Sequence, residues 1–366
     1  MRDKKIGVIT LQKNISSYGA SLQAYATFMF LKSHGYDTRL IDLRSHENIF
    51  YKRSKQHLTI STSKRKSCIK GRFVYYLRNP KKIFRFWNFN KQLQYTRPYF
   101  SVDQLFNKPP NFDVYCTGSD QTLNPRLTIA PDAFLLGFTD GKKVSYASSL
   151  GEVPLEEKYL SYYKDYLPKY NHISVREEHT KNVIGSYFNK NEISITIDPT
   201  LLLPIRHYED ICISPSINDD YLLFFSLHPN ISNIRFAQNI ATSNRLKLIV
   251  IGRKIKGIEA DFIASAGPKE WLGYIKFAKH IITDSFHGTV FSLLLNDNFI
   301  SLVPLHGDNR IGQLLKLFGL EDHIKYIENR EKYSVDETIF DRSIFLKKLD
   351  IEVQKSKDWF LNAIES

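Results

Sequence analysis

The sequence predicts an α/β fold of two doubly wound domains that face a central cleft. Short apolar runs of strand type alternate with helix-like stretches in both halves of the chain, which is typical of parallel sheets covered by helices. The length of 366 residues accommodates two domains of ~100–200 residues each. Polar residues and glycines follow several of the apolar runs, at the strand ends where open α/β sheets bind ligands.

The first strand–helix–strand unit lies near the N-terminus. "KIGVITL" (5–11) is a compact apolar run that predicts a strand. Apolar residues within 20–36 repeat with helical spacing, and Gly35 marks the helix end. "DTRLIDLR" (37–44) returns as a strand, so the crossover is long enough for parallel pairing.

The rest of the chain continues this alternation. In the first half, further strands are expected at 113–121, 142–151, 172–178 and 194–203. In the second half, strands at 220–227, 247–252, 281–286 and 297–304 alternate with helices at 234–246, 268–280, 287–295 and 311–319. We predict an N-terminal domain over 1–205, a C-terminal domain over 206–335 and terminal helices over 336–366.

The positive charge is concentrated in one segment. The formal net charge is +13, and residues 51–100 hold fourteen Lys or Arg and no Asp or Glu. Removing these fourteen from the 51 basic residues leaves 37, against 38 acidic ones, so the rest is near neutral. We predict a basic, aromatic-rich insertion at about 48–102 of the N-terminal domain. This composition suits an anionic membrane surface or a nucleic acid, and a solvated helical hairpin is the alternative.

Several classes of protein find no support in the sequence. It shows neither a signal peptide nor ~20 consecutive apolar residues, so we expect a cytoplasmic protein. Cys68, Cys116 and Cys212 lack CxxC spacing, which argues against a disulfide framework or zinc site. The dinucleotide, P-loop, HExxH, GxSxG and Asp-x-Asp motifs are missing. We therefore expect no cofactor and no metal.

One histidine stands at a predicted strand end, in "TDSFHGTVFS" (283–292). A histidine beside a strand is more often a core residue. However, Gly288 permits close backbone approach, and the helix expected from His287 has unpaired N–H groups that favour anions. Histidine also exchanges protons near neutral pH. We predict that His287 is an acid/base group at an anion-binding helix start.

Other candidates follow strands in the first half. Arg176 is either a surface arginine paired with Glu177 or Glu178, or a group that captures a carboxylate or phosphate through its planar guanidinium. The loop "GSDQTLNP" contains Asp120, which could serve as a general base. The remaining polar or glycine candidates near the predicted cleft are Tyr18, Gly19, Ser119, Gln121 and Asn124.

Eight stretches in succession resemble the polysaccharide pyruvyl transferase family. They cover roughly residues 5 to 320 and include "YGASLQAYA", "VYCTGSDQTLNP", "VSYASSLG", "ISVREEHT", "IDPTLLL" and "TDSFHGTVFSLLLNDNFI". The resemblance implies a two-domain GT-B fold. It also implies transfer of pyruvate from phosphoenolpyruvate onto two hydroxyls of one sugar, which forms a cyclic ketal and releases phosphate without a metal.

The resemblance assigns roles to four residues. His287 matches the essential histidine of the family, which either protonates the donor or assists departure of phosphate. Arg176 matches the arginine that binds the donor. Ser285, Gly288 and the amides after them would cradle the phosphate.

The sequence departs from the family pattern at two places. A better-characterised branch has an arginine two residues before the histidine, where this chain has Ser285. We expect the second donor-binding cation to be Arg310 or Arg253. The tryptophan that usually follows the "GSDQ" loop is missing near Leu123, which bears on how an acceptor sugar stacks.

The implied acceptor is a sugar, typically in a lipid-linked oligosaccharide. The basic segment would then hold the enzyme against the anionic inner face of the cytoplasmic membrane, and no nucleic acid is expected as a partner. The main alternative is a glycosyltransferase of the same fold that uses sugar nucleotides. A third hypothesis is a non-enzymatic basic module that binds nucleic acid or membrane.

Overall fold

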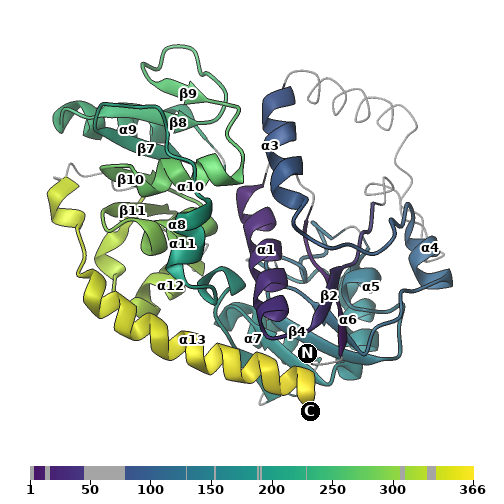
Figure 1. The fold of residues 1–366 in the computed structure, drawn as a ribbon. Helices are drawn as coiled ribbons and strands as arrows, with labels where there is room; N and C mark the ends of the chain where they lie inside the picture. The colour runs from purple at the N-terminus through teal and green to yellow at the C-terminus, as the bar shows by residue number, and fades with distance from the viewer. Residues whose placement is uncertain are drawn as a thin grey trace. The chain divides into compact units, whose positions relative to one another are not determined.

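A computed structural model describes residues 4–12, 17–44, 79–128, 130–151, 154–187, 189, 192–227, 229–305, 310–327 and 335–366. The chain divides into two compact units (Figure 1). Unit 1 contains Met1–Pro80, Asn90–Leu202 and Glu352–Ser366, and unit 2 contains Lys81–Phe89 and Leu203–Ile351. Residues 48–78 of the predicted basic insertion lie outside the described residues.

Unit 1 is built on a parallel six-stranded sheet of order β2-β1-β3-β4-β5-β6. Its strands are β1 (Lys5–Ile9), β2 (Asp37–Leu40), β3 (Val114–Thr117), β4 (Lys142–Ser148), β5 (His172–Val175) and β6 (Ile193–Ile195). All residues of β3, and all but the first residue of β1 and β4, are buried. This is why they read as continuous apolar runs: a parallel sheet is covered on both faces.

Unit 1 has several helices, and local signals mark both ends of α1. The helices are α1 (Tyr18–Ser33), α4 (Val102–Asn107), α5 (Pro131–Phe134), α6 (Leu160–Tyr166), α7 (Glu178–Ile184) and the last part of α13 (Arg342–Glu365). The Ser17 hydroxyl caps α1 by accepting a hydrogen bond from the N–H of Ala20 at 3.2 Å. Gly35 follows α1 with φ of 89°, a conformation that glycine adopts without strain.

Unit 2 has a second parallel six-stranded sheet, of order β12-β11-β10-β7-β8-β9. The strands are β7 (Tyr221–Phe225), β8 (Lys247–Ile251), β9 (Asp261–Ile263), β10 (His280–Thr283), β11 (Phe299–Val303) and β12 (Ile324–Tyr326). The helices are α3 (Pro80–Asn90), α8 (Ile205–Ile211), α9 (Ile231–Ser243), α10 (Pro268–Lys276), α11 (Phe286–Leu295), α12 (Arg310–Phe318) and the first part of α13.

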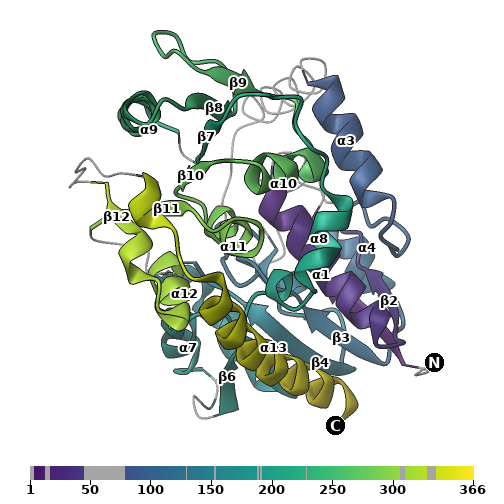
Figure 2. The same cartoon turned by 60° about the vertical axis from the view of Figure 1, so that its left-hand side comes forward.

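Helices cover both faces of this second sheet. Helix α9 packs on one face, where Ile234 and Ile240 contact Leu222 and Phe224 in one apolar cluster. Helix α10 lies on the other side of β7 (Figure 2), where the Trp271 ring meets Phe225 at 5.2 Å. The predicted α/β fold with parallel sheets and covering helices is therefore confirmed.

Helix α3 clusters with unit 2, although its residues belong to the basic segment between β2 and β3. Arg85 on α3 forms an ion pair with Glu270 at 2.8 Å and donates to the carbonyl of Ser265 at 2.8 Å. Gly267 allows this approach, because a Cβ there would lie 2.4 Å from the Cβ of Arg85. Within the described residues, no helix is both long and apolar enough to cross a membrane.

Candidate active site

Arg176 follows β5 directly, and its guanidinium is surrounded by carboxylates. Nη1 donates to Oδ2 of Asp198 at 2.8 Å, and Nε lies 3.4 Å from Oε2 of Glu177. Oδ1 of Asp120 lies 4.0 Å from Nη2. The arginine side chain is only 3% exposed, so its orientation is determined by these buried partners.

Asp198 holds this cluster together because both of its oxygens accept hydrogen bonds. Oδ1 accepts from the N–H of Thr200 at 3.0 Å and from its hydroxyl at 2.7 Å. Oδ2 accepts from Arg176 and lies 3.0 Å from the hydroxyl of Ser119. Asp198 therefore joins the ends of β3 and β5 to the turn that follows β6.

Tyr146 supports the same turn from β4. Its hydroxyl donates to the carbonyl of Ile197 at 3.0 Å. Burial raises the pKa of Tyr146, and the negative charge of Asp198 raises it further. The phenol therefore stays protonated and keeps donating its hydrogen bond.

Asp120 has a left-handed backbone conformation with φ of 68°. Its carbonyl accepts hydrogen bonds from Ser149 at 2.9 Å and Thr122 at 2.7 Å, which hold this conformation in place. Its side chain is 16% exposed. Asp120 is therefore a fixed carboxylate that solvent and ligands can reach.

The other candidates of unit 1 divide into buried and half-buried residues. Ser119 and Asn124 are buried, and Asn124 donates to Oε1 of the half-buried Gln121 at 2.8 Å. Tyr18 is buried in the first turn of α1, beside the half-buried Gly19. In this loop, Asp120 and Gln121 are thus the predicted residues best placed to meet a ligand.

In unit 2, His287 lies in the first turn of α11, after the end of β10. The hydroxyl of Ser285 caps the helix by accepting the N–H of Gly288 at 3.2 Å. His287 is 7% exposed, and its ring makes a T-shaped contact with the ring of Phe286, the ring centroids being 5.3 Å apart. Asp284 ties this turn to the end of β7 by accepting the N–H of Leu227 at 2.8 Å.

Gly288 has a packing role that the sequence did not indicate. A Cβ at this position would lie 2.2 Å from Oγ1 of Thr283 and 3.1 Å from Cβ of Ser285. Oγ1 of Thr283 in turn accepts the N–H of Ser285 at 3.1 Å. The glycine is therefore needed for α11 to begin so close to the end of β10.

The two candidate cations for the donor lie at separate places in unit 2. Arg310 is half-buried and begins α12, which follows β11. Arg253 is exposed after Gly252 at the end of β8. Arg253 contributes to lowering the pKa of Lys82 on α3, where the larger cause is burial of the lysine.

Sequence reasoning missed three carboxylates of these clusters as site residues. Asp284 follows β10 directly, whereas Asp198 lies three residues after the end of β6 and caps the helical turn Pro199–Leu201. An aspartate followed by a proline, as in Asp198 and Pro199, is a recognisable signal for the start of a helical turn. Glu177 was considered only as a surface partner of Arg176, whereas it is 2% exposed.

The arrangement can perform acid/base chemistry on anionic or hydroxyl-bearing ligands. Unit 1 presents the carboxylate of Asp120 beside a buried guanidinium, and unit 2 presents an imidazole at a helix N-terminus. A helix start stabilises negative charge through its N–H groups and dipole. Parallel α/β units with polar groups at their strand ends are typical of folds that bind ligands at that edge of the sheet.

Comparisons with solved structures support the α/β fold. The UDP-N-acetylglucosamine 2-epimerase from Rickettsia bellii is 9% identical, with a TM-score of 0.53 over 99% of this chain and 97% of that chain. The apo structure of OtsA is 8% identical, with a TM-score of 0.53 over 100% and 99% of the two chains. These similarities show the fold alone, an α/β fold of GT-B type. No curated protein matches significantly.

The family is shown by the sequence itself. The profile described as "Polysaccharide pyruvyl transferase" matches residues 18–306, which is most of the chain. The chain belongs to the polysaccharide pyruvyl transferase family, as the resemblance predicted. It is therefore a transferase enzyme of polysaccharide biosynthesis.

Proposed function

We propose that the enzyme moves pyruvate from phosphoenolpyruvate onto two hydroxyls of one sugar in a surface-polysaccharide precursor. The product is a cyclic ketal, and phosphate is released. The observation that carries the proposal is the position of His287 in the first turn of α11, in a chain that belongs to this family. A proton-transfer group at a helix N-terminus suits a phosphate-bearing donor.

The reaction needs one proton delivered and two removed. Protonation of the methylene carbon leaves a positive charge at C2, which the first sugar oxygen attacks while its own proton leaves. The second oxygen then displaces phosphate and closes the ketal, and its proton leaves with the phosphate or through a base. His287 delivers a proton to the methylene carbon or to the departing phosphate. Asp120 accepts the proton of an acceptor hydroxyl.

Donor binding requires cations from more than one residue. In the proposal, Arg176 binds the carboxylate of phosphoenolpyruvate, and the start of α11 at Ser285 and Gly288 binds the phosphate. The three carboxylates within 4.0 Å of Arg176 exceed its single positive charge. Additional positive charge must therefore offset the donor, and we assign it to Arg310 or Arg253.

The proposed donor contacts are guanidinium and N–H groups, so we propose that catalysis needs no metal. Turnover that survives dialysis against a chelator would support this assignment. Turnover that is lost and then restored by a divalent cation would contradict it.

The acceptor is proposed to be lipid-linked, with the enzyme at the inner face of the cytoplasmic membrane. The concentration of Lys and Arg in residues 51–100 supports this location, since anionic lipids attract such segments. Gln121 and the loop around it, together with the start of α1 at Tyr18 and Gly19, are the proposed acceptor contacts. Ser119 and Asn124 contribute by holding that loop.

The decisive experiment measures phosphate release from phosphoenolpyruvate with galactosyl, mannosyl and N-acetylhexosaminyl lipid acceptors. Wild type is compared with His287→Ala and with His287→Asn, which retains more of the ring volume. Acceptor-dependent release that falls ~10²–10⁴-fold in both variants is expected for a proton-transfer residue. Full activity in folded His287→Asn would remove His287 from the mechanism.

A second candidate function is a glycosyltransferase that uses sugar nucleotides, which the GT-B fold favours. Ligand-induced thermal stabilisation discriminates between the two. A ligand at 100 times its Kd stabilises the native protein by about 2.7 kcal/mol. Stabilisation by UDP-sugars, and none by phosphoenolpyruvate, would favour the glycosyltransferase.

A further inference from the structure

Helix α3 presents an aromatic pair to solvent. Phe84 is 61% exposed and Trp87 is 54% exposed. They are one helical turn apart, and their ring centroids lie 6.0 Å from each other with a tilt of 40°. Exposed apolar side chains that stand singly are ordinary, whereas adjacent ones form the contiguous patches that mark interaction surfaces.

The opposite side of α3 is firmly packed, so the outward face has a defined orientation in unit 2. Phe86 and Phe89 are 0% and 1% exposed. Arg85 is held by Glu270 and by the carbonyl of Ser265, both at 2.8 Å. The backbone of Gly267 lies close against α3, because a Cβ there would be 2.4 Å from the Cβ of Arg85.

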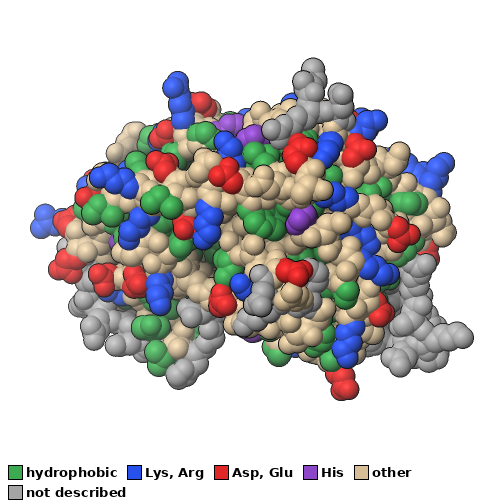
Figure 3. All heavy atoms as spheres, turned by 90° about the horizontal axis from the view of Figure 1, so that it is seen from below, with side chains coloured by type: hydrophobic (Ala, Val, Ile, Leu, Met, Phe, Trp, Pro, Cys, Tyr) green, Lys and Arg blue, Asp and Glu red, His purple; other side chains and the backbone are tan. Residues whose placement is uncertain are grey.

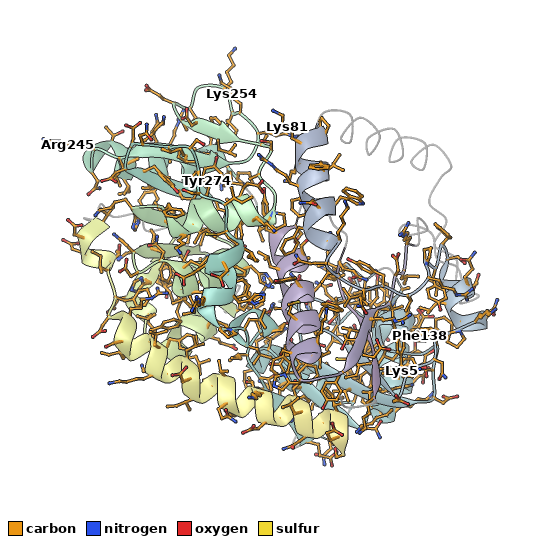
Figure 4. The ribbon with its side chains drawn as sticks, in the orientation of Figure 1. Lys5, Lys81, Phe138, Arg245, Lys254 and Tyr274 are labelled. Atoms are coloured by element: carbon orange, nitrogen blue, oxygen red, sulfur yellow. The ribbon has the colours of Figure 1, made fainter. Side chains whose placement is uncertain are left out.

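Cationic side chains predominate at this end of unit 2, although the loop after β8 also carries the exposed Glu259. Helix α3 contains Lys81, Lys82 and Arg85 and no acidic residue. The loop after β8 adds Lys254 and Lys256, which are exposed, and Figure 4 shows Lys254 and Lys81 toward the same end of unit 2. The face seen in Figure 3 is different, because acidic and basic side chains are interspersed there.

We propose that the outward face of α3, formed by Lys81, Phe84 and Trp87, docks onto an anionic lipid bilayer. Aromatic rings settle at the level of lipid headgroups, and nearby lysines attract the anionic phosphates. The purpose of this docking rests on the proposed function, in which the acceptor is carried by a lipid. Docking then brings unit 2 to the surface where that acceptor is held.

The geometry favours a bilayer over a saccharide or a nucleic acid. A sugar chain or a row of bases stacks on rings that offer flat, successive platforms. The Phe84 and Trp87 rings are tilted by 40° to one another, so they do not form one platform. Two rings that project from one helix face suit insertion between headgroups, which does not require parallel planes.

The test is flotation of the full-length protein with phosphatidylcholine vesicles that contain phosphatidylglycerol. Phe84→Ser/Trp87→Ser should lower the vesicle-bound to free ratio at least ~10-fold, because the inserting apolar surface is removed. Phe100→Ser is the matched control, since Phe100 is also 54% exposed but lies outside α3. Lys81→Glu should weaken binding at low salt, whereas Arg206→Glu, on an exposed site of α8, should not.

Trp87 provides a direct readout of insertion. Trp271 is 0% exposed and Trp359 is half-buried, so brominated lipids should quench mainly the fluorescence of Trp87. Trp87→Phe should abolish that quenching while retaining vesicle binding. Strong quenching that persists in Trp87→Phe would contradict insertion through α3.

Several outcomes would overturn the docking proposal. One is equal flotation of wild type and the serine double variant. Another is a raised KM for a soluble oligosaccharide acceptor with unchanged flotation, which would make α3 a carbohydrate surface. Vesicle binding without any pyruvyl transfer would instead refute the proposed function and leave the docking face standing.

Discussion

Arg176 and Asp198 form a buried ion pair, with Nη1 of the arginine 2.8 Å from Oδ2 of the aspartate. Their side chains are 3% and 0% exposed. Burying two charges is costly unless each has good partners. Here Thr200 satisfies the second oxygen of Asp198, so the pair sets the orientation of the guanidinium before any ligand binds.

Asp198→Asn should raise the KM for phosphoenolpyruvate about 10–100-fold, with a smaller effect on kcat. The amide retains the shape of the carboxylate but cannot balance the buried charge of Arg176. Removing one partner of such a buried charge pair typically costs about 2–5 kcal/mol. Steady-state kinetics and a melting curve measure both effects. Thr200→Ser is the control because it keeps the hydroxyl. An unchanged KM in the Asn variant would remove Asp198 from donor positioning.

Substitutions at Asp120 should separate its backbone role from its acid/base role. Asn tolerates the left-handed φ of 68°, so Asp120→Asn should fold normally but lose ~10²–10⁴-fold in kcat. Asp120→Ala should also lose about 1 kcal/mol of stability, which Asp120→Gly should recover without recovering activity. Near-normal turnover of Asp120→Asn would show that another group takes the proton.

Gly288→Ala should destabilise unit 2 by about 1–3 kcal/mol, because its Cβ would overlap Oγ1 of Thr283 at 2.2 Å. The expected readout is a lower urea midpoint. Thr283→Ala removes the overlapping oxygen. The double variant Gly288→Ala/Thr283→Ala should therefore lose less free energy of unfolding than the sum of the losses in the two single variants. Additive losses would show that the glycine is not required by this contact.

The stability of unit 2 should fall on acidification because of His280. Burial lowers the pKa of His280 to about 4, although its Nδ1 lies 2.7 Å from the amide oxygen of Asn298. An unfolded histidine titrates near ~6.5. Between these values the unfolded chain binds more protons than the folded one, so the free energy of unfolding falls as pH decreases from 6.5 to 4.

The part of this loss that belongs to His280 can be isolated by mutation. From pH 7 to pH 4.5 the histidine should contribute a loss of about 2–3 kcal/mol. His280→Asn should lower stability at neutral pH but lack this contribution, so the difference between wild type and variant should shrink in acid. A difference that is constant with pH would contradict a buried neutral histidine.

The order of strands and helices could be predicted because it depends on local apolar patterns. The buried strands β3 and β7 are evident in "VYCT" and "YLLFF". The short edge strands β9 and β12 were missed, since their three residues are only partly buried and form no apolar run. The association of α3 with unit 2 was also missed, because it depends on the contacts of Arg85 with residues far along the chain.

The sequence by itself determined the alternating α/β fold, the family, and the position of His287 at the start of a helix after a strand. These features depend on residues that are close together in the sequence. Only the tertiary structure decided that Asp198, 22 residues from Arg176, lies against its guanidinium, and that Gly288 is required by Thr283. Such contacts bring together groups from different strand ends, and no local periodicity encodes which charges or atoms will meet there.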